Sequence, residues 1–199
     1  MGRKRVGRRV ARRRLPSLLA REANEAGENH SIGFKRQRPL LLVTMPEVGD
    51  KAPDFALYDY DKKMRKSSEF LTKGGKTIFA FFPGAFTGPC TQEMCTFRDM
   101  YHELGKMKGT VVGISVDAPF AQKAFAEKNG LAFPLLCDFQ RAVVRKYGVV
   151  WNNLGGVEGY VCANRAIFVV DGQGKITFKW VAPEPGTLPD FEAVKKALL

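Results

Sequence analysis

The chain has 199 residues, of which 45% are hydrophobic and 26% are charged, the balance of a globular protein with one main core. No apolar run approaches the roughly 18 residues that span a bilayer, and the sequence has neither a Gly-X-Y period nor a dense cysteine pattern, so a membrane-spanning protein, a collagen-like fibre and a disulfide-stapled toxin are excluded. The net charge of +12 lies mostly at one end: residues 1–44 hold 12 Lys and Arg against 3 Asp and Glu, whereas residues 45–199 hold 20 against 17.

Residues 1–44 are predicted to be a basic, disordered extension, because MGRKRVGRRVARRR has too few apolar side chains to form a core. The short, broken apolar stretch Leu15–Ala20 argues against a secretory signal, and Glu22, Glu25 and Glu28 argue against a transit peptide. Polybasic contact with nucleic acid or anionic lipid stays open for this segment. Met45 stands where the body begins, so an over-long start is a further interpretation. We expect the folded domain to span residues 45–199.

From Met45 onward, strands and helices alternate. The expected strands and helices, in chain order, are a hairpin of Phe55–Tyr60 and Met64–Ser67, a buried strand Thr77–Phe82, a helix Cys90–Leu104, a strand Thr110–Val116, a helix Ala118–Asn129, a strand Phe133–Cys137, a helix Arg141–Tyr147, a hairpin of Ala166–Val170 and Lys175–Val181, and a helix Asp190–Leu198. Alternation favours parallel central strands with right-handed crossovers, and the late hairpin adds an antiparallel edge. The predicted fold class is α/β: a thioredoxin-like fold with a central mixed sheet flanked by helices.

The four cysteines are Cys90, Cys95, Cys137 and Cys162. None belongs to a C-x-x-C, so neither a zinc ribbon nor a thioredoxin-type dithiol is present. A zinc site made from Cys90, Cys95 and His102 would lack a fourth ligand, and their helical spacing does not converge on a tetrahedron. We therefore expect no metal, and we expect a reducing, cytoplasmic compartment.

The segment FPGAFTGPCTQEMCTFRD, residues 82–99, is the most informative part of the chain. It places Cys90 just after a strand-to-helix loop, in the first turn of a helix, where free backbone N–H groups and the helix dipole favour an anion. A thiol there has a lowered pKa, so the sequence predicts a thiolate at neutral pH. Pro83 and Pro89 stiffen the loop, and the Thr87 hydroxyl can point into the same pocket.

The pattern Pro83-x-x-x-Thr87-x-x-Cys90 resembles the signature of the peroxiredoxins. It is followed by Glu93 and, much later, by Arg165 in NRAIFVVD, as in that family. The likeness covers residues 45–199 through four further segments, VGDKAPDFAL, GISVD, FPLLCD and VAPEPG. The bacterioferritin comigratory protein branch, which has a second cysteine five residues downstream, is the most similar type.

This resemblance implies a thiol-dependent peroxidase that reduces hydrogen peroxide and small organic hydroperoxides through a cysteine sulfenic acid, with no bound cofactor. Cys90 would be the peroxidatic cysteine, Thr87 and Arg165 would stabilise charge on the departing oxygen, and Pro83 would shield the thiolate. Glu93 would orient Arg165. Pro89 has no N–H, so any amide donor that the family uses there would have to come from Gly88 or from a water molecule.

Cys95 is the candidate resolving cysteine, with Cys162 as the second choice. On an ideal helix the Cα atoms of Cys90 and Cys95 lie roughly 8–9 Å apart, whereas a disulfide needs less than about 7 Å. A bond between them therefore requires the first helical turn to unwind.

The resemblance also implies a thioredoxin-like reductant and a homodimer or higher homo-oligomer, without membrane or nucleic-acid partners. Two alternatives remain. A thioredoxin-fold disulfide oxidoreductase without peroxidase activity would need a C-x-x-C at the helix start, and Cys90-Thr-Gln-Glu has none. A binding module recruited to nucleic acid by residues 1–44 would show salt-sensitive binding and no peroxide consumption.

Overall fold

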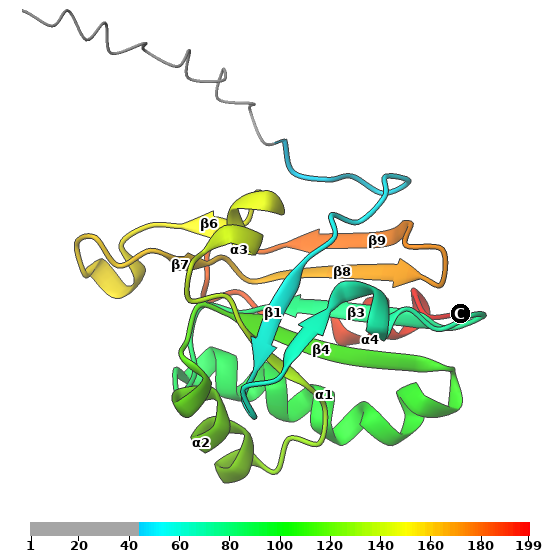
Figure 1. The fold of residues 1–199 in the computed structure, drawn as a ribbon, viewed down its shortest axis with the longest axis horizontal. Helices are drawn as coiled ribbons and strands as arrows, with labels where there is room; N and C mark the ends of the chain where they lie inside the picture. The colour runs from blue at the N-terminus through cyan, green and yellow to red at the C-terminus, as the bar shows by residue number, and fades with distance from the viewer. Residues whose placement is uncertain (1–43) are drawn as a thin grey trace, which may run out of the picture. The chain divides into compact units, whose positions relative to one another are not determined.

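The computed structural model describes residues 44–199, so the predicted extension lies, apart from Thr44, outside the described residues. A seven-stranded sheet is the centre of the described chain, with strand order β2-β1-β5-β4-β3-β8-β9. Figure 1 shows the sheet with α1 and α2 on one side. The strands are β1 Ala56–Asp59, β2 Met64–Lys66, β3 Lys76–Phe81, β4 Gly109–Ser115, β5 Leu135–Cys137, β8 Ala166–Asp171 and β9 Ile176–Val181.

The helices are α1 Gly88–Lys106, α2 Pro119–Asn129, α3 Ala142–Lys146 and α4 Phe191–Lys196, with two single 3-10 turns, η1 Ser67–Phe70 and η2 Leu154–Gly156. A separate two-stranded sheet joins β6 Val150–Trp151 to β7 Cys162–Ala163. No helix in this described part of the chain combines the length and apolar character that crossing a bilayer requires.

The strand pairing confirms the predicted mixed sheet. β3, β4 and β5 are parallel neighbours, and the β8–β9 hairpin joins β3 in antiparallel register. The β1–β2 hairpin closes the opposite edge through antiparallel pairing with β5. This order leaves the carboxyl ends of β3, β4 and β5 at one edge of the sheet, where the loops that follow them meet.

Alternation along β3 divides the core into two clusters, one on each face. Ile78, Ala80 and Phe82 pack with α1, α2 and α4, whereas Phe79 and Phe81 pack with α3 and Tyr147. α1 approaches β4 closely, because a Cβ at Gly113 would lie 2.5 Å from Leu135 Cδ2 and 3.4 Å from the sulfur of Met94. Glycine at this position therefore makes room chiefly for Leu135 of the neighbouring strand β5, with Met94 of α1 packed beside it.

Most expected elements are present, with different ends. α1 begins two residues before Cys90, and β5 is only three residues long rather than five. Arg141 is not in the helix as expected: it is the residue before α3 and has a left-handed backbone, φ 59. The sequence does not predict the pairing of β6 with β7, since two-residue strands leave no periodic pattern.

Candidate active site

Cys90 is the third residue of α1 and is completely buried against the sheet. The Pro83–Thr87 loop runs from β3 to this helix, and Thr87 is the residue at which the helix is capped. Pro83 and Gly84 are buried, Thr87 is half-buried, and Gly88 and Pro89 are exposed. The Cys90 side chain is therefore shielded from solvent by the loop and the sheet.

Arg165 is brought to Cys90 from 75 residues away. It stands immediately before β8, which is paired with β3, and its side chain is only 1% exposed. Its Nη2 donates to the Cys90 sulfur at 3.4 Å. A cation at this distance from a thiol favours the thiolate.

The other two guanidinium nitrogens of Arg165 also donate hydrogen bonds. Nη1 donates to Glu93 Oε2, while Nε and Nη2 donate to the Pro185 carbonyl oxygen at 3.2 and 2.8 Å. The Asn164 side chain holds two backbone segments together. Its Oδ1 accepts from the Arg165 backbone N–H at 2.9 Å, and its Nδ2 donates to the Ala182 carbonyl at 2.8 Å. The planar fork is thus held in one orientation with an N–H directed at sulfur.

Glu93 lies one turn below Cys90 on α1 and is fully buried. Burial raises the pKa of Glu93 to about 7, although the Arg165 guanidinium opposes the rise. Its Oε2 is paired with Arg165, but its Oε1 has no hydrogen-bond partner within residues 44–199. The carboxyl group is therefore poised between its charged and neutral forms near neutral pH.

The pKa of the Cys90 thiol is raised in this closed arrangement, because burial is the largest influence on it. Arg165, the Thr87 hydroxyl and the Gly84 backbone N–H all lower the pKa, but they do not offset burial. The prediction of a thiolate from the helix terminus alone is therefore wrong for the closed pocket. The backbone N–H that lowers the pKa of the thiol is that of Gly84, whereas the sequence predicts a donor from Gly88 or from a water molecule.

Cys95 lies on the same intact helix and is half-buried; all four thiols are free. Its sulfur accepts from Arg98 Nη1 at 3.5 Å and lies 3.8 Å from Asn129 Oδ1, at the end of α2. Arg98 also donates to the Asn129 carbonyl at 2.7 Å. These contacts place Cys95 on the α2 side of the helix, away from the Arg165 cluster.

Cys137 and Cys162 are buried in β5 and β7. Burial raises the pKa of Cys137 to about 12 and that of Cys162 to about 11, and the nearby Cys90 adds to the rise at Cys162. Both thiols are therefore poor nucleophiles at neutral pH.

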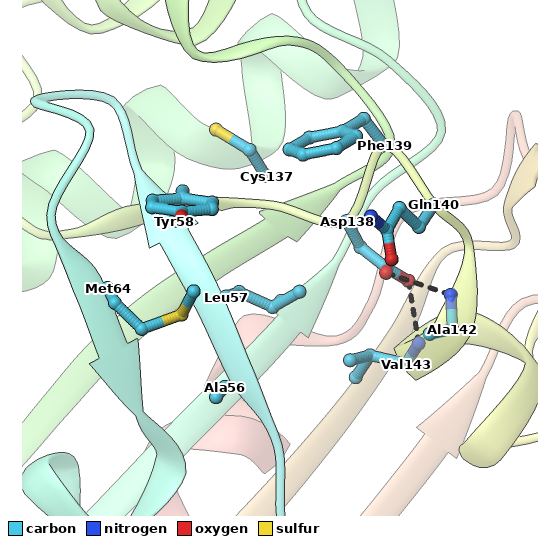
Figure 2. A pocket seen from close by; sticks show the side chains of 10 residues that line it. All are labelled: Ala56, Leu57, Tyr58, Met64, Cys137, Asp138, Phe139, Gln140, Ala142 and Val143. Carbon is cyan, nitrogen blue, oxygen red and sulfur yellow. Dashed lines mark hydrogen bonds between the residues drawn. The ribbon is translucent and has the colours of Figure 1, made fainter.

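A cavity of about 120 Å³ adjoins Cys137 rather than Cys90. Figure 2 shows it between β1 and the start of α3, bordered by Tyr58, Met64 and Phe139. Asp138 lies in its wall, with a carboxylate that accepts from the backbone N–H groups of Ala142 and Val143, both at 2.9 Å. These bonds hold the Asp138 carboxylate against the first turn of α3.

Residues 48–179 match the model of the AhpC/TSA family. The chain is 37% identical over 134 residues to the bcp peroxiredoxin of Coxiella burnetii, covering 67% of this chain and 87% of that protein. It is 32% identical over 166 residues to the thiol peroxidase of Oceanobacillus iheyensis, covering 82% and 95%. The chain belongs to the AhpC/TSA family of peroxiredoxins.

A solved structure supports the same assignment. The peroxidoxin BcpB of Mycobacterium tuberculosis superposes with a TM-score of 0.66 at 32% identity, over 78% of this chain and 95% of that one. The predicted thioredoxin-like fold is confirmed, and the protein is a thiol-dependent peroxidase acting on a hydroperoxide. The disulfide oxidoreductase alternative is not favoured.

Proposed function

We propose that Cys90 is the peroxidatic cysteine and that it reduces hydrogen peroxide and small organic hydroperoxides. The Cys90 thiolate attacks one peroxide oxygen, so that an S–O bond forms as the O–O bond breaks. The sulfur becomes a sulfenic acid, and the departing oxygen leaves with the bonding electron pair and takes up a proton, as water or an alcohol. The proximity of Arg165 Nη2 to the sulfur, at 3.4 Å, is the observation that supports this role most directly.

The surrounding groups have separate roles in this proposal. Arg165 stabilises first the thiolate and then the charge on the departing oxygen, and Glu93 and the Pro185 carbonyl keep its guanidinium in place. The Thr87 hydroxyl, which donates to the Gly84 carbonyl at 3.1 Å, can turn to donate to the peroxide. Pro83 is buried beside them and keeps bulk water from the sulfur.

Cys95 is the resolving cysteine in this cycle. Its thiol attacks the Cys90 sulfenic sulfur, an S–S bond forms and water leaves. Because both residues lie on the continuous helix α1, the first turn must unwind before the sulfurs can meet. Cys162, the second choice, is disfavoured by the pKa of about 11 that its burial produces.

A dithiol protein of the thioredoxin type would then reduce the Cys90–Cys95 disulfide by thiol–disulfide exchange. We further propose that the enzyme works without a bound cofactor, in the cytoplasm, and as a homodimer or larger homo-oligomer. Sedimentation of the reduced and oxidised protein would measure the last of these.

The test is peroxide consumption with dithiothreitol and, separately, with a thioredoxin system. Cys90→Ser should abolish both activities. Cys95→Ser should keep the dithiothreitol activity and lose the thioredoxin-dependent one, because a small thiol reduces a sulfenic acid directly. Cys137→Ser, a buried thiol outside the site, is the matched control and should keep both. An active Cys90→Ser variant would refute the proposal.

A further inference from the structure

A chain of buried polar groups starts on α2 and ends at the loop that covers Cys90. Gln122 Nε2 donates to Ser115 Oγ at 2.7 Å, and the Ser115 hydroxyl donates to Asp117 Oδ2, also at 2.7 Å. The same Asp117 oxygen accepts from the backbone N–H of Ala85 at 2.7 Å. Gln122 and Ser115 are completely buried, so water does not compete for the bond between them, whereas Asp117 and Ala85 are half-buried.

The loop that Asp117 contacts has a conformation that it would not keep without support. Phe86, the residue after Ala85, has a left-handed backbone with φ 64, which is unfavourable for a residue with a side chain. Its ring packs edge-on against Phe125 of α2, with centroids 5.3 Å apart. The loop is therefore held from outside by α2 and by the residues after β4.

The same loop carries two groups that lower the pKa of the Cys90 thiol: the backbone N–H of Gly84, immediately before Ala85, and the hydroxyl of Thr87, two residues after it. Gly84 and Thr87 are also tied to each other, because the Thr87 hydroxyl donates to the Gly84 carbonyl at 3.1 Å. The Asp117–Ala85 bond lies between them in sequence. If this bond were lost, the N–H and the hydroxyl would no longer be fixed relative to sulfur.

We propose that Asp117 is a positioning residue for the peroxidase reaction: by accepting the Ala85 N–H, it holds the Pro83–Thr87 loop in the geometry that serves Cys90. Ser115 and Gln122 fix the rotamer of Asp117, since Ser115 Oγ donates to the carboxylate and also accepts from the Asp117 backbone N–H at 3.1 Å. The inference rests on the proposed role of Cys90. This positioning role needs an oxygen at residue 117 that accepts the Ala85 N–H, and it does not need the negative charge of the carboxylate.

The experiment compares Asp117→Ala, which removes the acceptor, with Asp117→Asn, whose amide oxygen can accept both bonds. Single-turnover oxidation by hydrogen peroxide and the pH profile of Cys90 alkylation are measured for each, together with thermal unfolding. Asp117→Ala should slow oxidation by roughly 100-fold, the lower end of the cost of a lost donor to developing charge, and should move the alkylation profile to higher pH. Asp117→Asn should restore most of the rate.

Asp171→Ala is the matched control, because Asp171 Oδ1 likewise accepts two backbone N–H groups, in the β8–β9 turn at the opposite end of β3. It should leave oxidation unchanged. If Asp117→Ala does not fold, Ser115→Ala is measured instead, because it removes the hydroxyl that holds the Asp117 carboxylate in place. A wild-type oxidation rate in Asp117→Ala, or equal losses in the Ala and Asn variants, would overturn the Asp117 inference alone. Activity in Cys90→Ser would overturn the proposed function as well.

Discussion

Replacing Glu93 with Gln should remove a steep dependence of stability on pH. Glu93 is buried with one oxygen unpaired, and its pKa is raised to about 7 from the ordinary 4.5. A group whose pKa is raised by folding binds a proton more tightly in the folded chain, so its contribution is full below pH 4.5 and is lost as pH rises through 7. Each unit of difference between the folded and unfolded pKa values is worth about 1.4 kcal/mol, so the shift from 4.5 to about 7 contributes about 3 kcal/mol in all.

The measurement is urea unfolding of the reduced protein at several pH values, for wild type and Glu93→Gln. Because Gln does not titrate, the free energy of unfolding of wild type minus that of the variant should fall by about 2 to 3 kcal/mol between pH 5 and 7.5. Glu103→Gln is the control on the same helix: Glu103 is exposed, and its pairing with Lys195 lowers its pKa, so it should add no slope in this window. A flat difference for Glu93→Gln would mean that Arg165 keeps the carboxylate ionised throughout, and the reasoning from burial would be wrong.

Three further substitutions test the site. Arg165→Lys should slow single-turnover oxidation by at least roughly 100-fold, because one ammonium cannot reproduce the fork that holds Cys90 and its neighbours; unchanged stopped-flow rates would contradict this. Thr87→Val should slow oxidation roughly 100- to 1,000-fold, with recovery in Thr87→Ser, and failure of Ser to restore the rate would argue against the hydroxyl. Asn164→Ala should lower the free energy of unfolding in urea by about 1–3 kcal/mol, because the Arg165 N–H and the Ala182 carbonyl lose their buried partner; equal stability would show that water replaces it.

The fold could be predicted because its signals are local. Apolar runs mark the central strands, a 3.6-residue period marks α1, and the Asp171-Gly-Gln-Gly turn marks the β8–β9 hairpin. The contact between Cys90 and Arg165 spans 75 residues and was predicted through the family pattern alone. No local period could have brought these two residues together.

The remaining parts of the site depend on groups that carry no sequence signal. The Pro185 carbonyl that holds Arg165 and the Gly84 N–H near Cys90 are backbone atoms, which every residue has. Asp117 follows a strand, where an acidic residue is more often solvated. The thiol pKa was misjudged for a related reason: the helix terminus is visible in the sequence, whereas the depth of burial appears only once the loop and the helix are packed.

The first turn of α1 is built so that it can unwind at low cost. Thr87 caps the helix without a side-chain bond to its backbone, and its hydroxyl donates instead to Gly84 in the preceding loop. Gly88 favours the helix least among the non-proline residues, and the N–H that Pro89 lacks would have had no partner within the helix. The main cost of unwinding is therefore the withdrawal of the Cys90 side chain from its buried position.

Oxidation reduces this cost. A sulfenic acid adds a polar oxygen to a side chain that is already completely enclosed, so the buried state becomes less favourable as soon as the peroxide has reacted. On the proposed role of Cys95, the reduced thiol would keep the helix folded beside Arg165, and the sulfenic acid would favour release toward Cys95. If this coupling operates, amide hydrogen exchange in the first turn of α1 should be faster in Cys95→Ser held as the sulfenic acid than in the same variant reduced, whereas equal protection would separate unwinding from oxidation.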